Sequence, residues 1–172
     1  VPGKGHDFFI ELASLLLKIR NDLEFVILGD GPLKNIIMEH IKESRMDGQV
    51  LVLGHKENIM DFINCLDIMT ICSEHEGIPY VLLESLKLHT PVVSTRVGGV
   101  PEVIDSGVNG ILTEPGDIQA MKNALVCLLG DPSQMAALAS KGYATLVERF
   151  SSRNMASQTI TLYNQLIRQG LK

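Results

Sequence analysis

Two glutamates bracket a short loop and the start of a predicted helix in the segment SEHEGIPYVLLES, residues 73–85. Glu76 precedes a Gly-Ile-Pro turn, and Glu84 follows eight positions later in a run that is otherwise mostly apolar. Glutamate is seldom buried without a partner. An ionised carboxylate only accepts hydrogen bonds, so two of them suit a ligand that carries hydroxyl groups at both ends.

The residues between the two acids could bind an anion. Pro79 suits the first turn of a helix, where its missing N–H costs nothing, and Gly77 lets the backbone come close to a ligand. Free amides near Ile78, Tyr80 and Val81 would form an anion site at the helix amino end. A nucleoside diphosphate sugar has the matching shape, with an anionic centre between two hydroxyl-rich groups. Two glutamates eight residues apart also occur by chance, so spacing alone leaves both interpretations open.

Three other loops have the composition of ligand-binding turns. Lys4, in PGKGH, could reach a phosphate or could be a solvated loop residue. The sequence GDGP, with Gly29 and Gly31, resembles half of a dinucleotide fingerprint, but it lacks the third glycine and the later acid. That favours a tight strand-to-helix turn and disfavours a dehydrogenase. The loop VGGVPE, residues 97–102, could contact phosphate or sugar, or could serve only as a turn.

The histidines give weaker signals. His55 follows a predicted strand and could line a pocket or lie at the surface, and we expect His75 to be exposed. No pair of histidines has the spacing of a zinc site. A Ser-His-Asp or Cys-His arrangement cannot be argued from this sequence.

The elements that must position these residues alternate along the chain. Apolar spacing predicts helices at 7–20, 32–45, 57–66, 79–89, 101–107, 117–129, 133–148 and 152–169, and strands at 25–28, 50–54, 67–73, 91–95 and 110–113. Strands this apolar are typical of parallel sheets covered on both faces, and such sheets bind ligands beyond the carboxyl ends of their strands. The predicted fold class is therefore α/β, with a Rossmann-like, doubly wound, mostly parallel sheet. Expected helix N-caps are Asp117, Ser133 and Ser151 or Ser152.

Composition sets further limits. The chain has 172 residues, enough for one domain with a sizeable core, and 45% of them are hydrophobic. The formal net charge of −5 argues against a broad nucleic-acid surface. Three cysteines are too few for a disulfide framework, which predicts reduced thiols and an intracellular protein. We expect neither a signal peptide nor a membrane span.

Taken together, the motifs resemble one known family. The segment from Glu76 to Glu84 is similar to the paired-glutamate signature of retaining glycosyltransferases of family 4 (group 1), which have the two-domain GT-B architecture. The surroundings agree in order: ILGDGP at 27–32, CSEHEGIPYVLLES at 72–85, PVVSTRVGGVPEVIDSGVNGIL at 91–112 and EPGD at 114–117. The resemblance covers essentially the whole chain.

The resemblance implies a role for each matching residue. Glu84 would accept hydrogen bonds from the ribose, and Glu76 would face the donor sugar. Lys4 would hold the diphosphate and stabilise the charge on the leaving group, so Glu76 and Lys4 are the catalytic candidates. His55 and Lys56 would lie beside the base. The remaining substrate-binding candidates come from two turns: Gly29, Gly31, Gly77, Ile78, Pro79, Tyr80 and Val81.

The resemblance also implies a domain organisation. Residues 1–172 would form the C-terminal, nucleotide-sugar-binding half of GT-B, with the first strand and the N-terminal acceptor domain outside this chain. The last helix, 152–169, would pack toward that missing domain and would leave an apolar patch here. The first residues, VPGKGHD, have a loop composition, which likewise suggests a fragment of a longer polypeptide.

The expected function is transfer of a hexose or N-acetylhexosamine from a nucleoside diphosphate sugar to an acceptor, in glycan or surface polysaccharide synthesis. We expect no activity from this chain alone, no cofactor and no metal requirement. The expected partners are the donor and the protein's own N-terminal domain, with no nucleic acid. The expected location is the cytoplasm, with peripheral association of the full-length enzyme at the inner membrane face.

Two alternatives remain at this point. One is a noncatalytic nucleotide-sugar-binding module, against which the intact Lys4, Glu76 and Glu84 argue. The other is a nucleotide-sugar epimerase of GT-B fold, a class that as a rule lacks this carboxylate spacing.

Overall fold

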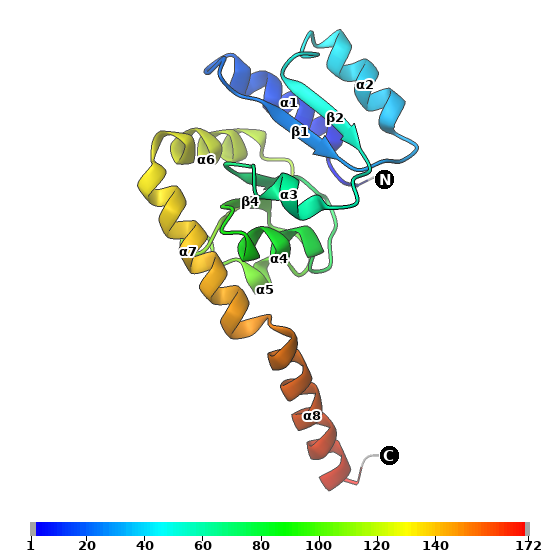
Figure 1. The fold of residues 1–172 in the computed structure, drawn as a ribbon, viewed down its shortest axis with the longest axis vertical. Helices are drawn as coiled ribbons and strands as arrows, with labels where there is room; N and C mark the ends of the chain where they lie inside the picture. Colours follow the sequence, from blue (N-terminus) through cyan, green and yellow to red (C-terminus); the bar gives the residue numbers. More distant parts are fainter. Residues whose placement is uncertain (1–2, 171–172) are drawn as a thin grey trace.

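The computed structural model describes residues 3–170, in which helices and strands alternate as predicted. Figure 1 shows their arrangement. In chain order the elements are α1 (His6–Leu17), β1 (Phe25–Leu28), α2 (Lys34–Glu43), β2 (Val50–Gly54), α3 (Ile59–Ile63), β3 (Met69–Ile71), α4 (Tyr80–Lys87), β4 (Val92–Thr95), α5 (Val100–Val103), β5 (Ile111–Thr113), α6 (Ile118–Gly130), α7 (Pro132–Arg149) and α8 (Ser152–Arg168).

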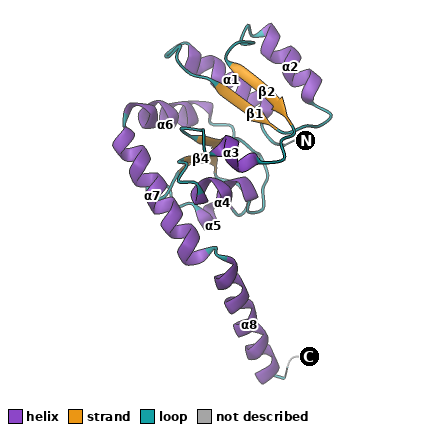
Figure 2. Ribbon diagram, in the orientation of Figure 1, coloured by secondary structure: helices purple, strands orange, loops and turns teal. Residues whose placement is uncertain are grey.

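The strands form two parallel groups. In Figure 2 the orange arrows of β1 and β2 lie side by side, apart from β4. β1 pairs with β2, and β4 lies between β3 and β5. The predicted parallel α/β architecture is confirmed, and within residues 3–170 the sheet is divided between β1 and β3. Both of these strands are therefore edges that pair on one side only.

Helices cover the strands on both faces, because each has one apolar stripe to bury. One core lies between α4, α5 and the strands β3–β5, and includes the fully buried Leu82, Val92 and Val100. A second core joins α1 and α6 to β4, and a third joins α1 and α2 to β2. α1 packs against α6, and α4 packs against α7. The cores therefore hold the loops at the carboxyl ends of the strands on a rigid base.

The residues that cap the observed helices can be compared with the predicted N-caps. The Asp117 side chain accepts a hydrogen bond from Ala120 N–H, and Ser151 accepts one from Asn154 N–H, so both predictions are confirmed. The predicted cap at Ser133 is wrong, because Ser133 lies within α7 and the N-cap is two residues earlier. There Asp131 accepts from Gln134 N–H and Pro132 occupies the first helical position, where proline is favoured.

α8 projects away from the rest of the molecule as a single helix (Figure 1). None of its residues is buried, and its large apolar side chains are exposed: Met155, Ile160, Leu162, Tyr163 and Ile167. The predicted apolar patch on this helix is thus present in this chain. No helix within residues 3–170 combines the length and the hydropathy that crossing a bilayer requires.

Candidate functional site

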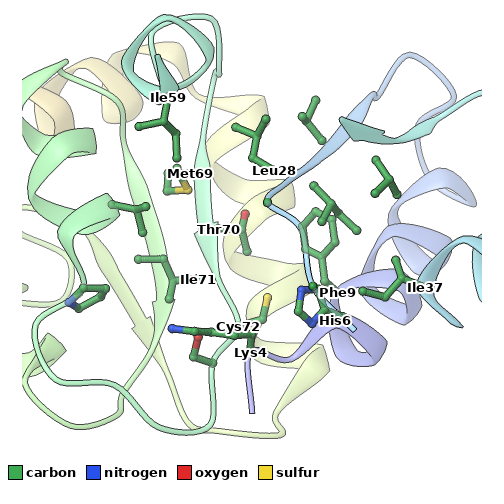
Figure 3. A pocket seen from close by; sticks show the side chains of 18 of the residues that line it. Lys4, His6, Phe9, Leu28, Ile37, Ile59, Met69, Thr70, Ile71 and Cys72 are labelled. Carbon is green, nitrogen blue, oxygen red and sulfur yellow. The ribbon is translucent and has the colours of Figure 1, made fainter. Parts of the chain in front are cut away.

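A cavity of about 620 Å³ lies between β1 and β3. Its interior is apolar: Figure 3 shows Leu28 and Met69 on opposite sides, with Phe9 and Ile37 nearby. Its polar lining comes largely from loops that follow β1 and β3, with Asp30 and Lys34 on one side and Lys4, Ser73 and Glu76 on the other. Polar groups therefore gather at the carboxyl ends of the strands, where such sheets bind ligands.

Glu76 is held by two hydrogen bonds to one oxygen. Lys4 Nζ and Ser73 Oγ each donate to Glu76 Oε1, both at 2.7 Å. The Glu76 side chain is only 11% exposed. Burial pushes its pKa upward, but the hydrogen bonds from Lys4 and Ser73 and the charge of Lys4 outweigh that effect, so the pKa lies below its usual value. Glu76 is therefore a carboxylate at neutral pH.

Lys4 reaches Glu76 because its loop is attached to the end of β3. Glu74 N–H donates to Gly3 O at 2.8 Å. Gly5 has φ 70°, and a Cβ at this position would lie 2.0 Å from Cys72 O. Only glycine allows both this backbone conformation and this approach. The glycines on either side of Lys4 therefore fix its position.

The amino end of α4 borders the same cavity. Pro79 has φ −69° and is the N-cap, one position earlier than predicted, and Ile78, Pro79, Tyr80 and Val81 all line the cavity. The first amides of a helix have no intrahelical acceptor and carry partial positive charge. This end of α4 and the Lys4 ammonium group together provide the positive charge that an anion would need.

Glu84 lies one turn beyond Tyr80 on the same face of α4. It is half-buried but is not part of the cavity lining, and no hydrogen bond or ion pair of its carboxylate is found within residues 3–170. The structure thus brings Lys4 and Glu76 into contact and leaves Glu84 further along the helix. Gly77 also lies outside the lining.

The loop after β1 supplies a second ion pair that sequence reasoning missed. Lys34 Nζ lies 3.0 Å from Asp30 Oδ2, and Gly31 N–H donates to Asp30 Oδ1. The hydrogen bond from Lys34 is the main reason that the pKa of Asp30 is lowered. Gly29, with φ 122°, and Gly31, both candidates for substrate binding, line the cavity. The four-residue spacing of Asp30 and Lys34 was the available signal.

The histidines and Lys56 follow the expectations only in part. His55 and Lys56 are exposed and do not line the cavity, and Lys56 Nζ lies 5.6 Å from the centre of the Phe62 ring. His75 is exposed, as expected. His6, which the sequence did not single out, lines the cavity, and burial is the main cause of its lowered pKa.

The VGGVPE loop lies behind Glu76 and does not line the cavity. A Cβ on Gly98 would lie 1.6 Å from Glu76 O, and Gly99 N–H donates to Gly77 O at 3.0 Å. Of the two uses considered for this loop, the structure favours a turn that supports the glutamate. Within residues 3–170, no group of three or more His, Cys, Asp or Glu side chains is arranged to hold a metal ion.

Comparison with known proteins gives a consistent result. The family model described as "Glycosyl transferases group 1" matches residues 1–131. N-acetyl-alpha-D-glucosaminyl L-malate synthase of Bacillus anthracis is 33% identical over 147 residues, which are 86% of this chain and 39% of that protein. The chain spans less than half the length of the curated relatives it matches.

Solved structures show the same fold. TarM of S. aureus, in a complex with UDP, superposes with a TM-score of 0.89 at 25% identity, over 95% of this chain and 34% of that one. The C-terminal domain of a glycosyl transferase group 1 family protein (LpcC) from Francisella tularensis gives 0.80 at 28% identity, over 88% of this chain and 82% of that one. The predicted fold class, one half of a GT-B architecture, is confirmed.

Proposed function

The chain belongs to the glycosyl transferases group 1 family, and from this premise we propose that it is the C-terminal, donor-binding half of a retaining GT-B enzyme of family 4. The full-length enzyme transfers a hexose or N-acetylhexosamine from a nucleoside diphosphate sugar to an acceptor, in glycan or surface polysaccharide synthesis. The observation that carries the proposal is the contact of Lys4 with Glu76 beside the amino end of α4.

The proposed donor lies along this edge of the sheet. Its diphosphate binds the Lys4 ammonium group and the free amides of α4, where positive charge is concentrated. Its sugar faces Glu76, and its ribose lies toward Glu84, further along the helix. The carboxylates therefore stand at the two ends of the ligand, where they accept hydrogen bonds and do not repel the phosphates.

In the proposed reaction, the bond between the anomeric carbon and the diphosphate oxygen breaks, the acceptor oxygen forms its bond on the same face of the sugar, and the acceptor hydroxyl passes its proton to the departing diphosphate oxygen. Lys4 and the α4 amides stabilise the negative charge that accumulates on the departing diphosphate. These groups take the part that a metal ion has in other phosphate chemistry, so the proposed enzyme needs no metal.

The divided sheet supports the view that this chain is part of a larger unit. Phe25 N–H donates to Gln49 O and Gly29 N–H to Gly54 O, so the intervening Val26 and Leu28 direct their backbone groups away from β2. Met69 N–H donates to Pro91 O, so Thr70 faces away from β4 in the same manner. Unpaired backbone groups of β1 and β3 thus face a common apolar space.

That space has the form of a slot for one strand. A second cavity, of about 400 Å³, lies at the amino ends of the same strands, and Val26, Met69 and Thr70 line both cavities. Gly3 lies at the carboxyl end of β3. A strand that led into the Lys4 loop would be parallel to β1 and β3, and α1 would be its crossover to β1. We therefore assign the slot to the segment that precedes residue 1 in the full-length protein.

α8 supports the same proposal. Its apolar side chains have no covering partner within residues 3–170, and the curated relatives are more than twice as long as this chain. We assign this face to the N-terminal, acceptor-binding half of the same protein. The 172-residue chain alone then binds donor but transfers nothing.

Calorimetric titration of the full-length protein with UDP, GDP and ADP tests the proposal. Binding of one of these nucleotides, followed by hydrolysis or transfer of its sugar conjugate with retained anomeric configuration, is the expected result. A folded protein that binds none of the three would overturn it.

A further inference from the structure

We propose that Ser73 is a positioning residue that fixes the Glu76 carboxylate so that Oε2 is the oxygen that receives a donor-sugar hydroxyl. The inference rests on the proposed function, since it concerns the sugar end of the same site. Nothing in the family resemblance singles out this serine.

The first observation is the asymmetry of the carboxylate. Both hydrogen bonds found for Glu76, from Lys4 Nζ and from Ser73 Oγ, go to Oε1. Within residues 3–170, no hydrogen bond to Oε2 is found. A carboxylate oxygen has lone pairs for at least two donors, so Oε2 is the atom with full accepting capacity.

The second observation is that Ser73 is itself immobilised. It is 3% exposed, and its carbonyl accepts a hydrogen bond of 2.6 Å from Thr95 Oγ1. Thr95 is 1% exposed at the end of β4. The hydroxyl of Ser73 therefore approaches Glu76 from a fixed point in the core, and not from a mobile surface loop.

The third observation concerns the backbone of Glu76. Gly98 sits so close to the Glu76 carbonyl that any side chain would collide with it, and Gly99 N–H donates to Gly77 O. The backbone of Glu76 is thus held by Gly98 and Gly99, and its carboxylate is held separately by Ser73. With both ends fixed, the direction in which Oε2 points is determined by the fold.

Ser73 does what Lys4 alone cannot do. The Lys4 side chain is 46% exposed, and the proposed function requires it to donate to the diphosphate as well. The hydrogen bond from the buried, neutral Ser73 hydroxyl does not change when Lys4 donates to the diphosphate. Ser73 therefore keeps Glu76 ionised and oriented while Lys4 contacts the donor.

The test compares two ligands in the full-length protein. The affinity for the preferred nucleoside diphosphate (UDP, GDP or ADP) is measured beside the affinities for its glucose and N-acetylglucosamine conjugates. The preference is the ratio of the affinity for the better sugar conjugate to the affinity for the diphosphate alone. In S73A this ratio is expected to fall by about 10-fold or more, as for the loss of a hydrogen bond to a charged group, while binding of the diphosphate alone is unchanged. S73T keeps the hydroxyl and is expected to restore the preference.

A matched control is S94A. Ser94 is fully buried in β4, and its hydroxyl donates to Thr95 O and not to Glu76, so its removal should leave the preference unchanged. A second readout is the acid limb of sugar-conjugate binding, which should move to higher pH in S73A because the carboxylate has lost a stabilising donor. This readout does not depend on whether S73T folds.

The outcomes separate the two proposals. If E76A loses the preference and S73A keeps it, the positioning role is wrong and the proposed function stands. If E76A and S73A both keep it, or the wild type has none, Glu76 does not face the sugar and the inference fails, whereas the proposed function fails only if no nucleoside diphosphate binds. A loss of diphosphate binding in S73A equal to the loss of conjugate binding would assign Ser73 a purely structural role and overturn the inference.

Discussion

At the scale of single residues, Glu76 and Glu84 have different surroundings. Glu76 is nearly enclosed and carries two short hydrogen bonds, whereas Glu84 is half-buried without a partner among the described residues. A carboxylate that is already paired is positioned before a ligand arrives. A carboxylate without a partner can accept hydrogen bonds from a ligand without breaking any hydrogen bond within the protein. The proposed roles follow this difference, with Glu76 at the sugar and Glu84 at the ribose.

Replacing Glu84 by alanine should weaken binding of the nucleoside diphosphate by about 10- to 100-fold, because hydrogen bonds to a charged group contribute about 1–3 kcal/mol. Thermal stability should change little, since no intramolecular partner would be lost. Calorimetric titration measures the affinity. E43A, at an exposed position near the end of α2, is the matched control. An E84A affinity equal to that of the control would remove Glu84 from the site.

Glu76 should make the stability of the protein depend on pH. Its pKa is lower in the folded state than in the unfolded chain, where it is about 4.3. The stabilisation from its ionised form is therefore complete above the unfolded pKa and is lost as the pH falls through the folded pKa. Thermal unfolding of wild type and E76Q from pH 7 to pH 3 should show a wild-type advantage that disappears at the acid end. A constant difference across this range would contradict the lowered pKa.

At the scale of elements, the site depends on loops that touch through their backbones. Gly5 lies against Cys72, and Gly98 lies against Glu76, each at a distance that excludes a Cβ. These contacts join three separate loops, those before α1, after β3 and after β4. The glycines therefore determine the geometry of the charged residues although they carry no functional group.

G98A should lower stability by about 1–3 kcal/mol or more, because Gly98 has φ 50° and an added Cβ would overlap the Glu76 carbonyl. Binding of sugar conjugates should weaken along with it. Gly48 is the control, since a Cβ added at Gly48 would have no neighbour within 4 Å. G48A should change the melting temperature little, and an equally small effect of G98A would show that the loop yields easily.

The sequence predicted most elements and part of the site. Bounds of β1 and β2 agree with the prediction, because short β-branched runs between turn residues have one sensible interpretation. The cap of α7 was wrongly predicted at Ser133, because serine and aspartate are both favoured N-caps and apolar spacing does not fix a helix start to the residue. The role of Gly98 and the Ser73 hydrogen bond could not be predicted, since each joins residues through a tertiary contact or a loop conformation that has no periodic signal.

At the scale of the whole molecule, the open edges of β1 and β3 predict a difference between this chain and the full-length protein. Amides of Val26, Leu28 and Thr70, which face the slot, should exchange hydrogen rapidly in the 172-residue chain. They should be protected by about 100-fold or more in the full-length protein, where the proposed strand pairs with them. Amides of the central strand β4 should be protected in both and serve as the control. Equal exchange in the two proteins would mean that the slot stays open.

The bond between Gly3 and Glu74 has a mechanical consequence. It couples the start of the described chain to the segment that ends at Glu76, and Gly5 presses on the same segment at Cys72. A displacement of residue 3 would thus move the Lys4 ammonium group and the Glu76 carboxylate together, without changing the distance between them.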